Sequence, residues 1–301
     1  MAQVRRGRVR VGSRLVSYRE AGSEDGPVVL LAHGVGSDSG TWEPAMPELA
    51  ARGLRVLAPD LLGLGEAVPP RRPAIGHSLA PLADLLRDLL VALGLPGATI
   101  VGHSFGGAIA IWFAHHHPRH TQRLVLISSG GLGKGVHPIL RAATLPGGYP
   151  VLRLAFNHRT DAILRAPALH RLLRLSPMAA DNLVRASRVL ADPVGRVGFV
   201  TSLRSVVRPS GQRASMVEGR VLDPRTPTMI IWSVADRIVP VAHAHALHQY
   251  LPGSRLELFP GASHVPYRRF PQRFATVLAD FVTTTSPRSP GPQWASPQGD
   301  T

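Results

Sequence analysis

The residues best suited to catalysis in this 301-residue chain lie in the pentapeptide Gly102-His-Ser-Phe-Gly106. This is the G-x-S-x-G pattern of a nucleophile held at a sharp turn between a strand and a helix. Such a turn crowds the backbone two residues to either side, so both positions must be small, and the strain lifts the serine hydroxyl clear of the main chain. The pattern therefore predicts that Ser104 is a nucleophile for acyl transfer.

The segments that flank this turn have the composition that the turn requires. Residues 98–101 form a short apolar run that predicts a buried strand, and residues 105–116 predict a helix that is apolar almost all the way round. A helix that is apolar on every side belongs in the middle of a fold. This context argues against the simpler interpretation, a glycine-rich turn that contains a serine by chance.

Serine chemistry also needs donors for the negative charge that develops on the attacked carbonyl oxygen. The first N–H groups of the helix after Ser104, beginning with that of Phe105, lack an intrahelical acceptor and point toward the nucleophile. The apolar run 28–32 leads directly into His33-Gly-Val-Gly36, where glycine lets the backbone approach a reacting oxygen. We therefore expect the N–H groups of Val35 and Phe105 to form an oxyanion hole.

The elements that position these residues alternate in type along the chain. An amphipathic helix is predicted over residues 79–93 and further helices over 242–251 and 270–282. Short apolar runs predict strands over residues 9–11, 14–18, 28–32, 54–60, 98–101, 123–129, 228–232 and 255–259. The pattern predicts an α/β fold, a mostly parallel twisted sheet with helices on both faces, in which ligands bind beyond the carboxyl ends of the strands.

The alternation stops at the glycine-rich segment 130–133, and residues 132–222 show helical patterns with no clear strand. The best helical patterns are 163–175, 182–190 and 197–207. We interpret this segment as a helical lid inserted after the sixth strand. It holds 14 arginines and lysines but only four acids, which would favour an anionic substrate, although the solvated surface of an arginine-rich protein is the simpler explanation.

This pattern divides the chain into three parts. We expect one core domain built from residues 1–131 and 223–284, the lid at 132–222, and a tail at 285–301. The tail is rich in serine, proline, glycine and glutamine, and this composition predicts disorder.

Composition limits the classes of partner and the compartment. The chain has no cysteine, its apolar runs are too short to span a bilayer, and the arginines near its start have no apolar stretch behind them, so we expect a cytoplasmic protein. A net charge of +15 suggests nucleic acid, but no nucleic-acid-binding motif accompanies it. We expect a small-molecule substrate and neither a nucleic-acid nor a membrane partner; the oligomeric state stays open.

Two further polar residues follow the last two predicted strands. Asp236 lies four residues after the strand at 228–232, and His264 lies in the loop after the strand at 255–259. With His33-Gly34, the Asp60 turn and the Gly102–Gly107 segment, their order along the chain resembles that of the α/β-hydrolase superfamily, over roughly residues 14–283. The resemblance supports the α/β-hydrolase fold with a helical lid.

The resemblance also implies a role for each residue. Ser104 matches the nucleophile, His264 the general base, and Asp236 the group that orients the histidine and stabilises its charged form. Ser233 departs from the pattern, because relatives commonly have glycine after the tryptophan. The mechanism implies no metal and no organic cofactor.

The identity of the nucleophile narrows the reaction. Relatives that open epoxides or remove halides carry aspartate at this turn, whereas serine implies acyl transfer to water. We expect a serine hydrolase of a small to medium carboxylic ester or related acyl compound. Hydrolysis of a carbon–carbon bond, as in the meta-cleavage-product hydrolases, and ligand binding without turnover remain alternatives. The side chains expected to contact substrate are those of Trp42, Phe156, Leu203 and Val265.

Overall fold

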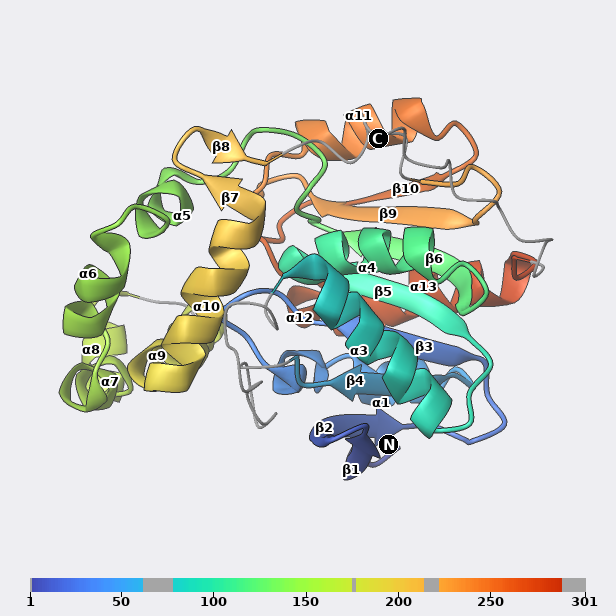
Figure 1. The fold of residues 1–301 in the computed structure, drawn as a ribbon, viewed down its shortest axis with the longest axis horizontal. Coiled ribbons are helices and arrows are strands. Elements are labelled where there is room, and N and C mark those ends of the chain that lie inside the picture. Colours follow the sequence, from blue (N-terminus) through green and yellow to red (C-terminus); the bar gives the residue numbers. More distant parts are fainter. Residues whose placement is uncertain (1, 62–77, 175–176, 214–221, 289–301) are drawn as a thin grey trace.

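The structure is a computed structural model that describes residues 2–61, 78–174, 177–213 and 222–288. Each of the eight strands predicted from the sequence is present, and all eight form one sheet (Figure 1). They are β1 (Arg5–Val11), β2 (Arg14–Ala21), β3 (Val28–Ala32), β4 (Arg55–Pro59), β5 (Ala98–His103), β6 (Thr121–Ile127), β9 (Thr228–Ser233) and β10 (Arg255–Phe259). Residues 68–73, a proline-rich stretch of the sequence, lie outside the described residues.

The sheet is mostly parallel. Its strand order is β1-β2-β4-β3-β5-β6-β9-β10, in which β1 pairs antiparallel with β2, β2 pairs antiparallel with β4, and every other pair is parallel. The carboxyl ends of the parallel strands therefore meet at one edge of the sheet. That edge carries His33, Ser104, Ser128, Asp236 and His264 in the segments that follow β3, β5, β6, β9 and β10.

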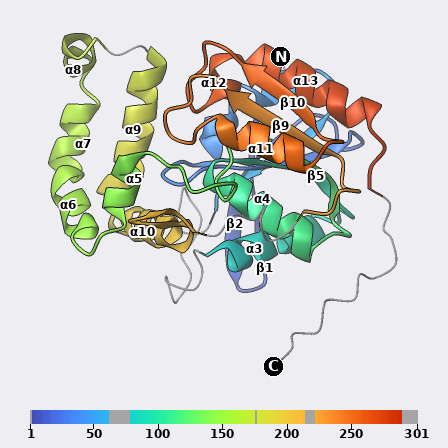
Figure 2. The same ribbon diagram turned by 90° about the horizontal axis from the view of Figure 1, so that it is seen from above.

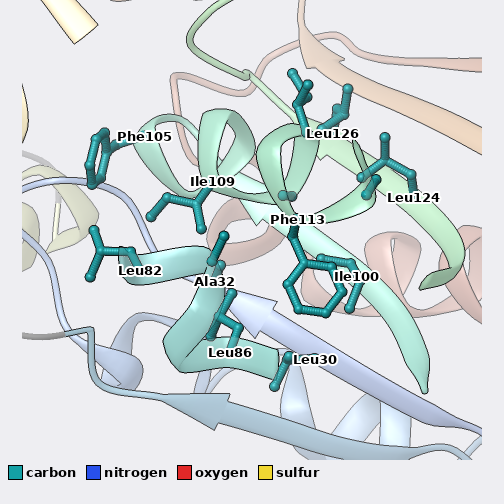
Figure 3. Close-up of a cluster of buried hydrophobic side chains, with 14 of the residues drawn as sticks. Leu30, Ala32, Leu82, Leu86, Ile100, Phe105, Ile109, Phe113, Leu124 and Leu126 are labelled. Carbon is teal, nitrogen blue, oxygen red and sulfur yellow. The ribbon is translucent and has the colours of Figure 1, made fainter. Parts of the chain in front are cut away.

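The central strands read as continuous apolar runs because both faces of the sheet are covered. Successive side chains point to opposite faces, so Leu30 and Ile100 join one buried cluster while Val29 and Val101 join the other. Figure 3 shows the first cluster, in which Leu30 and Ile100 lie beneath side chains of two helices.

The helices that cover the two faces are close to those predicted. Helices α3 (Leu79–Ala92), α4 (Phe105–His116) and α11 (Ala242–Tyr250) contribute to the cluster on one face. On the other face lie the short helices η1 (Ser39–Trp42), α1 (Met46–Ala50) and α12 (Pro266–Arg269), and the longer α13 (Pro271–Thr284). Figure 2 shows α12 and α13 on the side of the sheet away from α3 and α4. Helix α4 has nine buried residues among its twelve, as its apolar composition predicts.

Between β6 and β7 the described chain forms six helices, and they stand beside the sheet (Figures 1 and 2). They are α5 (Pro138–Ala143), α6 (Gly148–Ala155), α7 (His158–Leu164), α8 (Pro167–Leu172), α9 (Pro177–Ala191) and α10 (Pro193–Val206). The prediction of one helix over 163–175 is wrong. Pro167 lacks an N–H group and holds Ala166 in an extended conformation, so the chain breaks between α7 and α8.

Two smaller features also differ from the sequence-based expectation. A two-stranded hairpin, β7 (Val207–Arg208) and β8 (Gly211–Gln212), lies in the segment where no strand was expected. Residues 285–288 of the tail predicted to be disordered are held in place, because Arg288 pairs with Asp223 and binds the carbonyl of Pro118. The remainder of that tail lies outside the described residues. In the described part of the chain, no helix is long and apolar enough to cross a bilayer.

Candidate active site

The turn between β5 and α4 puts Ser104 in a conformation that few non-glycine residues adopt. Its φ of 54° and ψ of −115° fall outside the helical and extended regions, and it is partly exposed while its neighbours on both sides are buried. A Cβ atom on Gly102 would lie 2.2 Å from the carbonyl oxygen of Gly106, and one on Gly106 would lie 2.3 Å from that of Ala32. The two glycines are therefore required by close backbone packing.

The segment after β3 lies against this turn. A Cβ atom on Gly34 would lie 3.2 Å from the Cβ atom of Ser104, so the loop passes directly beside the candidate nucleophile. His33 fixes the loop, since its buried ring donates from Nδ1 to the carbonyl of Gly34 and accepts at Nε2 from the N–H of Leu61. Burial lowers the pKa of His33, which keeps this ring neutral.

The last two parallel strands bring a carboxylate and an imidazole together. His264 Nδ1 donates to Asp236 Oδ2 at 2.8 Å. The carboxylate has no exposed surface, and its other oxygen accepts the N–H groups of Ile238 and Val239 at 2.8 and 3.0 Å. The His264 ring remains partly exposed, and its Nε2 is free of this pairing.

Three kinds of interaction act on the pKa of Asp236. Burial alone would raise it, but the hydrogen bond and charge of His264, the N–H group of Val239 and the nearby Ser128 hydroxyl together lower it. The Ser128 hydroxyl is buried beside this carboxylate without a direct hydrogen bond. The group is thus an anion at neutral pH, as a carboxylate that orients and stabilises an imidazolium must be.

His103, for which the sequence indicated no role, links the candidate nucleophile to the loop that carries His264. Its Nε2 donates to the carbonyl of His264 at 2.9 Å, and the two rings lie 4.7 Å apart. Its Nδ1 accepts from the Tyr267 hydroxyl, which in turn lies 3.2 Å from the hydroxyl of Thr41. Burial, and next the positive charge of His264, lower the pKa of His103 to about 3, so the ring stays neutral and its tautomer is fixed.

Ser233, the one departure noted in the sequence, also has a contact that glycine lacks. Its hydroxyl donates to the carbonyl of Ser263, the residue before His264. The end of β9 is therefore joined to the loop that carries the imidazole. The only sequence signal for this contact was the unusual serine itself.

Comparison with known proteins agrees with this arrangement. A family model described as the alpha/beta hydrolase fold matches residues 27–268. The chain belongs to the α/β-hydrolase family. Membership supports an enzyme of the hydrolase type.

Three relatives illustrate how varied this α/β-hydrolase's neighbours are. It is 38% identical to an uncharacterised protein of Mycobacterium tuberculosis over 278 residues. The aligned region covers 90% of this chain and 79% of that protein. It is 29% identical over 272 residues to 2-hydroxymuconate semialdehyde hydrolase of Pseudomonas putida, covering 86% and 88%. It is also 29% identical over 268 residues to pyrethroid hydrolase of Sphingobium wenxiniae, covering 84% and 87%.

A solved structure shows the same fold. The 2-hydroxy-6-oxo-6-phenylhexa-2,4-dienoate hydrolase of Rhodococcus sp. strain RHA1 superposes on this α/β-hydrolase with a TM-score of 0.73. The match covers 94% of this chain and 100% of that one, at 22% identity. At this identity the likeness concerns the fold.

Two of the four predicted substrate-contact residues lie together beside the loop that follows β3. Phe156 and Leu203 belong to an apolar cluster between the helices after β6, and Val35 packs against the same cluster. Phe199 of α10 approaches the loop further, since a Cβ atom on Gly36 would lie 3.2 Å from its ring. The cluster therefore borders the predicted oxyanion loop.

The other two residues lie in the cluster on the face covered by α13. Val265 is partly buried there, directly after His264. Trp42 corrects the prediction, because it is fully buried and its ring stacks on Tyr267 with centroids 3.9 Å apart. The turn of η1 directs this side chain into the core, so it offers no exposed surface to a substrate.

Two further features bear on where ligands bind. A surface hollow of about 680 Å³ lies beside Pro227 and Arg288, at the amino end of β9 and so at the edge of the sheet opposite Ser104. Within the described ranges, no group of three or more His, Cys, Asp or Glu side chains is placed to hold a metal ion.

Proposed function

We propose that this protein is a serine hydrolase in which Ser104, His264 and Asp236 form a catalytic triad. His264 Nε2 takes the proton of the Ser104 hydroxyl as the oxygen attacks a carbonyl carbon, and then gives that proton to the leaving group. A water molecule then hydrolyses the acyl-enzyme by the same steps. The observation that carries the proposal is the pairing of His264 with a fully buried Asp236 at the edge where the strained Ser104 stands.

The backbone supplies the proposed stabilisation of the tetrahedral intermediate. The N–H group of Phe105 opens helix α4, where the first N–H groups lack an intrahelical acceptor. The N–H group of Val35 comes from the loop that passes beside Ser104. Two such donors in a site shielded from water usually supply the largest single contribution to catalysis.

We propose a small to medium carboxylic ester, or a related acyl compound, as the substrate. The apolar cluster that contains Phe156 and Leu203 borders the Val35 loop and suits an apolar acyl or alcohol group. In this proposal the helices from α5 to α10 act as the lid. The relative from Sphingobium wenxiniae, which is 29% identical and named pyrethroid hydrolase, supports this substrate class.

Hydrolysis of a carbon–carbon bond is the second candidate. The relative from Pseudomonas putida, named 2-hydroxymuconate semialdehyde hydrolase, favours it. The same three side chains suit that reaction as well, so the nucleophile alone does not separate the two. The pairing of His264 with Asp236 near Ser104 argues against ligand binding without turnover, because a binding protein would not need these groups.

Substrate panels distinguish these candidates. The purified protein is assayed with p-nitrophenyl esters of increasing acyl length and, separately, with a vinylogous 1,5-diketone of the meta-cleavage type. We expect ester hydrolysis with an optimum chain length, and its loss in Ser104→Ala. Turnover of the diketone without ester hydrolysis would establish the second candidate, and no turnover of either by a folded protein would support the binding function.

A further inference from the structure

The helices furthest from the sheet expose large apolar side chains. Figures 1 and 2 both place α6, α7 and α8 at the outer edge of the molecule. Among the described residues, eleven large apolar side chains are exposed, and seven of them lie between residues 138 and 174. They are Ile139, Leu145, Val151, Leu154, Ile163, Leu172 and Leu173. We call residues 138–174 the outer segment.

Helix α6 shows why this exposure is unusual. Its Leu152 packs on the apolar cluster around Leu203, as one side of an amphipathic helix should. Val151 and Leu154, however, are 63% and 72% exposed on the same helix. A helix with apolar side chains on two sides has a neighbour on each of them in a folded assembly, but here the second side has none within the described chain.

The charges of the outer segment have one sign. The segment contains six arginines and a single acid, Asp161. That carboxylate is buried, and it already binds the Ser187 hydroxyl and Arg165. The arginines at 153, 159, 165, 171 and 174 are all exposed. The surface therefore combines apolar and cationic side chains without an exposed anion.

The apolar and cationic side chains of the outer segment favour one kind of binding partner. A second copy of the chain would place the same arginines against each other, and like charges at an interface oppose association. An anionic bilayer meets both needs, because the acyl region accepts the apolar side chains and the headgroups attract arginine. We propose that the outer segment docks on the surface of an anionic lipid bilayer. This departs from the sequence-based expectation of no membrane partner.

Vesicle sedimentation with the full-length protein tests the proposal. Vesicles of phosphatidylglycerol with phosphatidylcholine should retain the protein, and vesicles of phosphatidylcholine alone should not. The pair Leu154→Asp with Ile163→Asp, and separately the pair Arg153→Gln with Arg159→Gln, should each weaken binding by on the order of tenfold. High salt should weaken binding by the wild type.

Matched variants separate docking from other effects. Val91→Asp changes an apolar residue of similar exposure on α3 of the core, and it should bind as the wild type does. Ser104→Ala should also bind normally, so this inference stands or fails apart from the proposed catalysis. Equal retention on both vesicle types, or full retention of the Leu154→Asp, Ile163→Asp pair, would overturn the proposal. A dimer in solution that this pair dissociates would assign the surface to a second copy instead.

Discussion

The turn around Ser104 and the helices that follow β6 are built on opposite principles. In the first region every residue of β5 is buried, as are nine of the twelve residues of α4. In the second, α5 and α8 bury none of their residues. One region is thus fixed by packing from all sides. In the other, α10 buries seven of its fourteen residues, while α5 and α8 stay at the surface.

The difference indicates which properties of the protein each region controls. A nucleophile in a strained conformation needs surroundings that hold it there, and the core provides them. The helical region joins the core through the apolar cluster around Leu203 and through charged pairs that α9 forms with Asp38, before η1, and with Arg268 of α12. Changes in the core should therefore abolish catalysis, whereas changes in the helical region should alter its own stability and the selection of ligands.

Removal of the nucleophile should have the largest effect. We expect Ser104→Ala to lower ester turnover by about 10⁴-fold or more, because no other group can form the acyl-enzyme. Ser128→Ala is the matched control, since Ser128 also has a positive φ and follows the neighbouring strand. It should keep activity within about tenfold. If Ser128→Ala lowered ester turnover as much as Ser104→Ala does, the loss would not be evidence that Ser104 is the nucleophile.

Truncation in the apolar cluster should separate the stability of the two regions. Leu203→Ala removes a side chain that is 2% exposed, at a cost of about 2–5 kcal/mol. Hydrogen exchange should speed up in α10 and its neighbours while β3 and β5 stay protected. Leu86→Ala, in the sheet cluster, is the control that should weaken the whole core. Equal deprotection of β5 by both variants would show that the two regions unfold together.

Replacement of the buried His103 should disturb the position of His264, because His103 is hydrogen-bonded to the loop that carries His264. His103→Gln removes the ring that accepts a hydrogen bond from the Tyr267 hydroxyl and donates one to the His264 carbonyl. We expect kcat to fall about tenfold with little change in KM, since the loop that carries the base is loosened. A change in KM alone would contradict this positioning role.

The same residue makes a prediction about pH. The folded-state pKa of His103 is lowered to about 3, by burial first, while an unfolded chain has an ordinary histidine pKa near ~6.5. Between these values the unfolded state binds the extra proton, so stability falls on acidification by up to about 1.4 kcal/mol per pH unit. Urea titrations of His103→Gln should show a flatter dependence over this range. An unchanged slope would argue that another group is responsible.

The charged contacts between α9 and the core should have the smallest effect. Asp181 pairs with Arg268 of α12, and Arg185 pairs with Asp38, which caps η1. Burial would raise the pKa of Asp181, but Arg268 and Arg185 lower it, so its contribution is present above the unfolded pKa and is lost as pH falls through the folded one. Asp181→Asn should cost about 1 kcal/mol or less, because the carboxylate is partly exposed. A larger loss, or one that is independent of pH, would make this contact a main attachment of α9.

The sequence was most informative for elements whose structure follows from a local pattern of apolar residues or from a turn motif. All eight strands of the sheet, and helix α4 to the residue, followed from apolar runs and from the turn at Ser104. Residues 163–175 were predicted as one helix because the apolar spacing continues across Pro167. The burial of Trp42 was missed because a sequence shows which residues are apolar but not which of them have neighbours.

The same limit explains what the sequence left out of the site. His103 stands inside the nucleophile motif at a position where the pattern accepts many residues, so nothing marked its hydrogen bond to a carbonyl 161 residues away. The exposure of Leu154 and its neighbours depends on how short helices pack, which no local pattern encodes. The Ser–Asp–His order, by contrast, was visible because each residue follows a strand of recognisable composition.

Covalent labelling tests the central claim most directly. The wild type, Ser104→Ala and His264→Ala are treated with a fluorophosphonate, and the modified residue is located by mass spectrometry. We predict a single adduct on Ser104 in the wild type, none in Ser104→Ala, and labelling slowed by about 10³-fold or more in His264→Ala. An adduct on a different serine, or none on the folded wild-type protein, would contradict the assignment of Ser104 as the nucleophile.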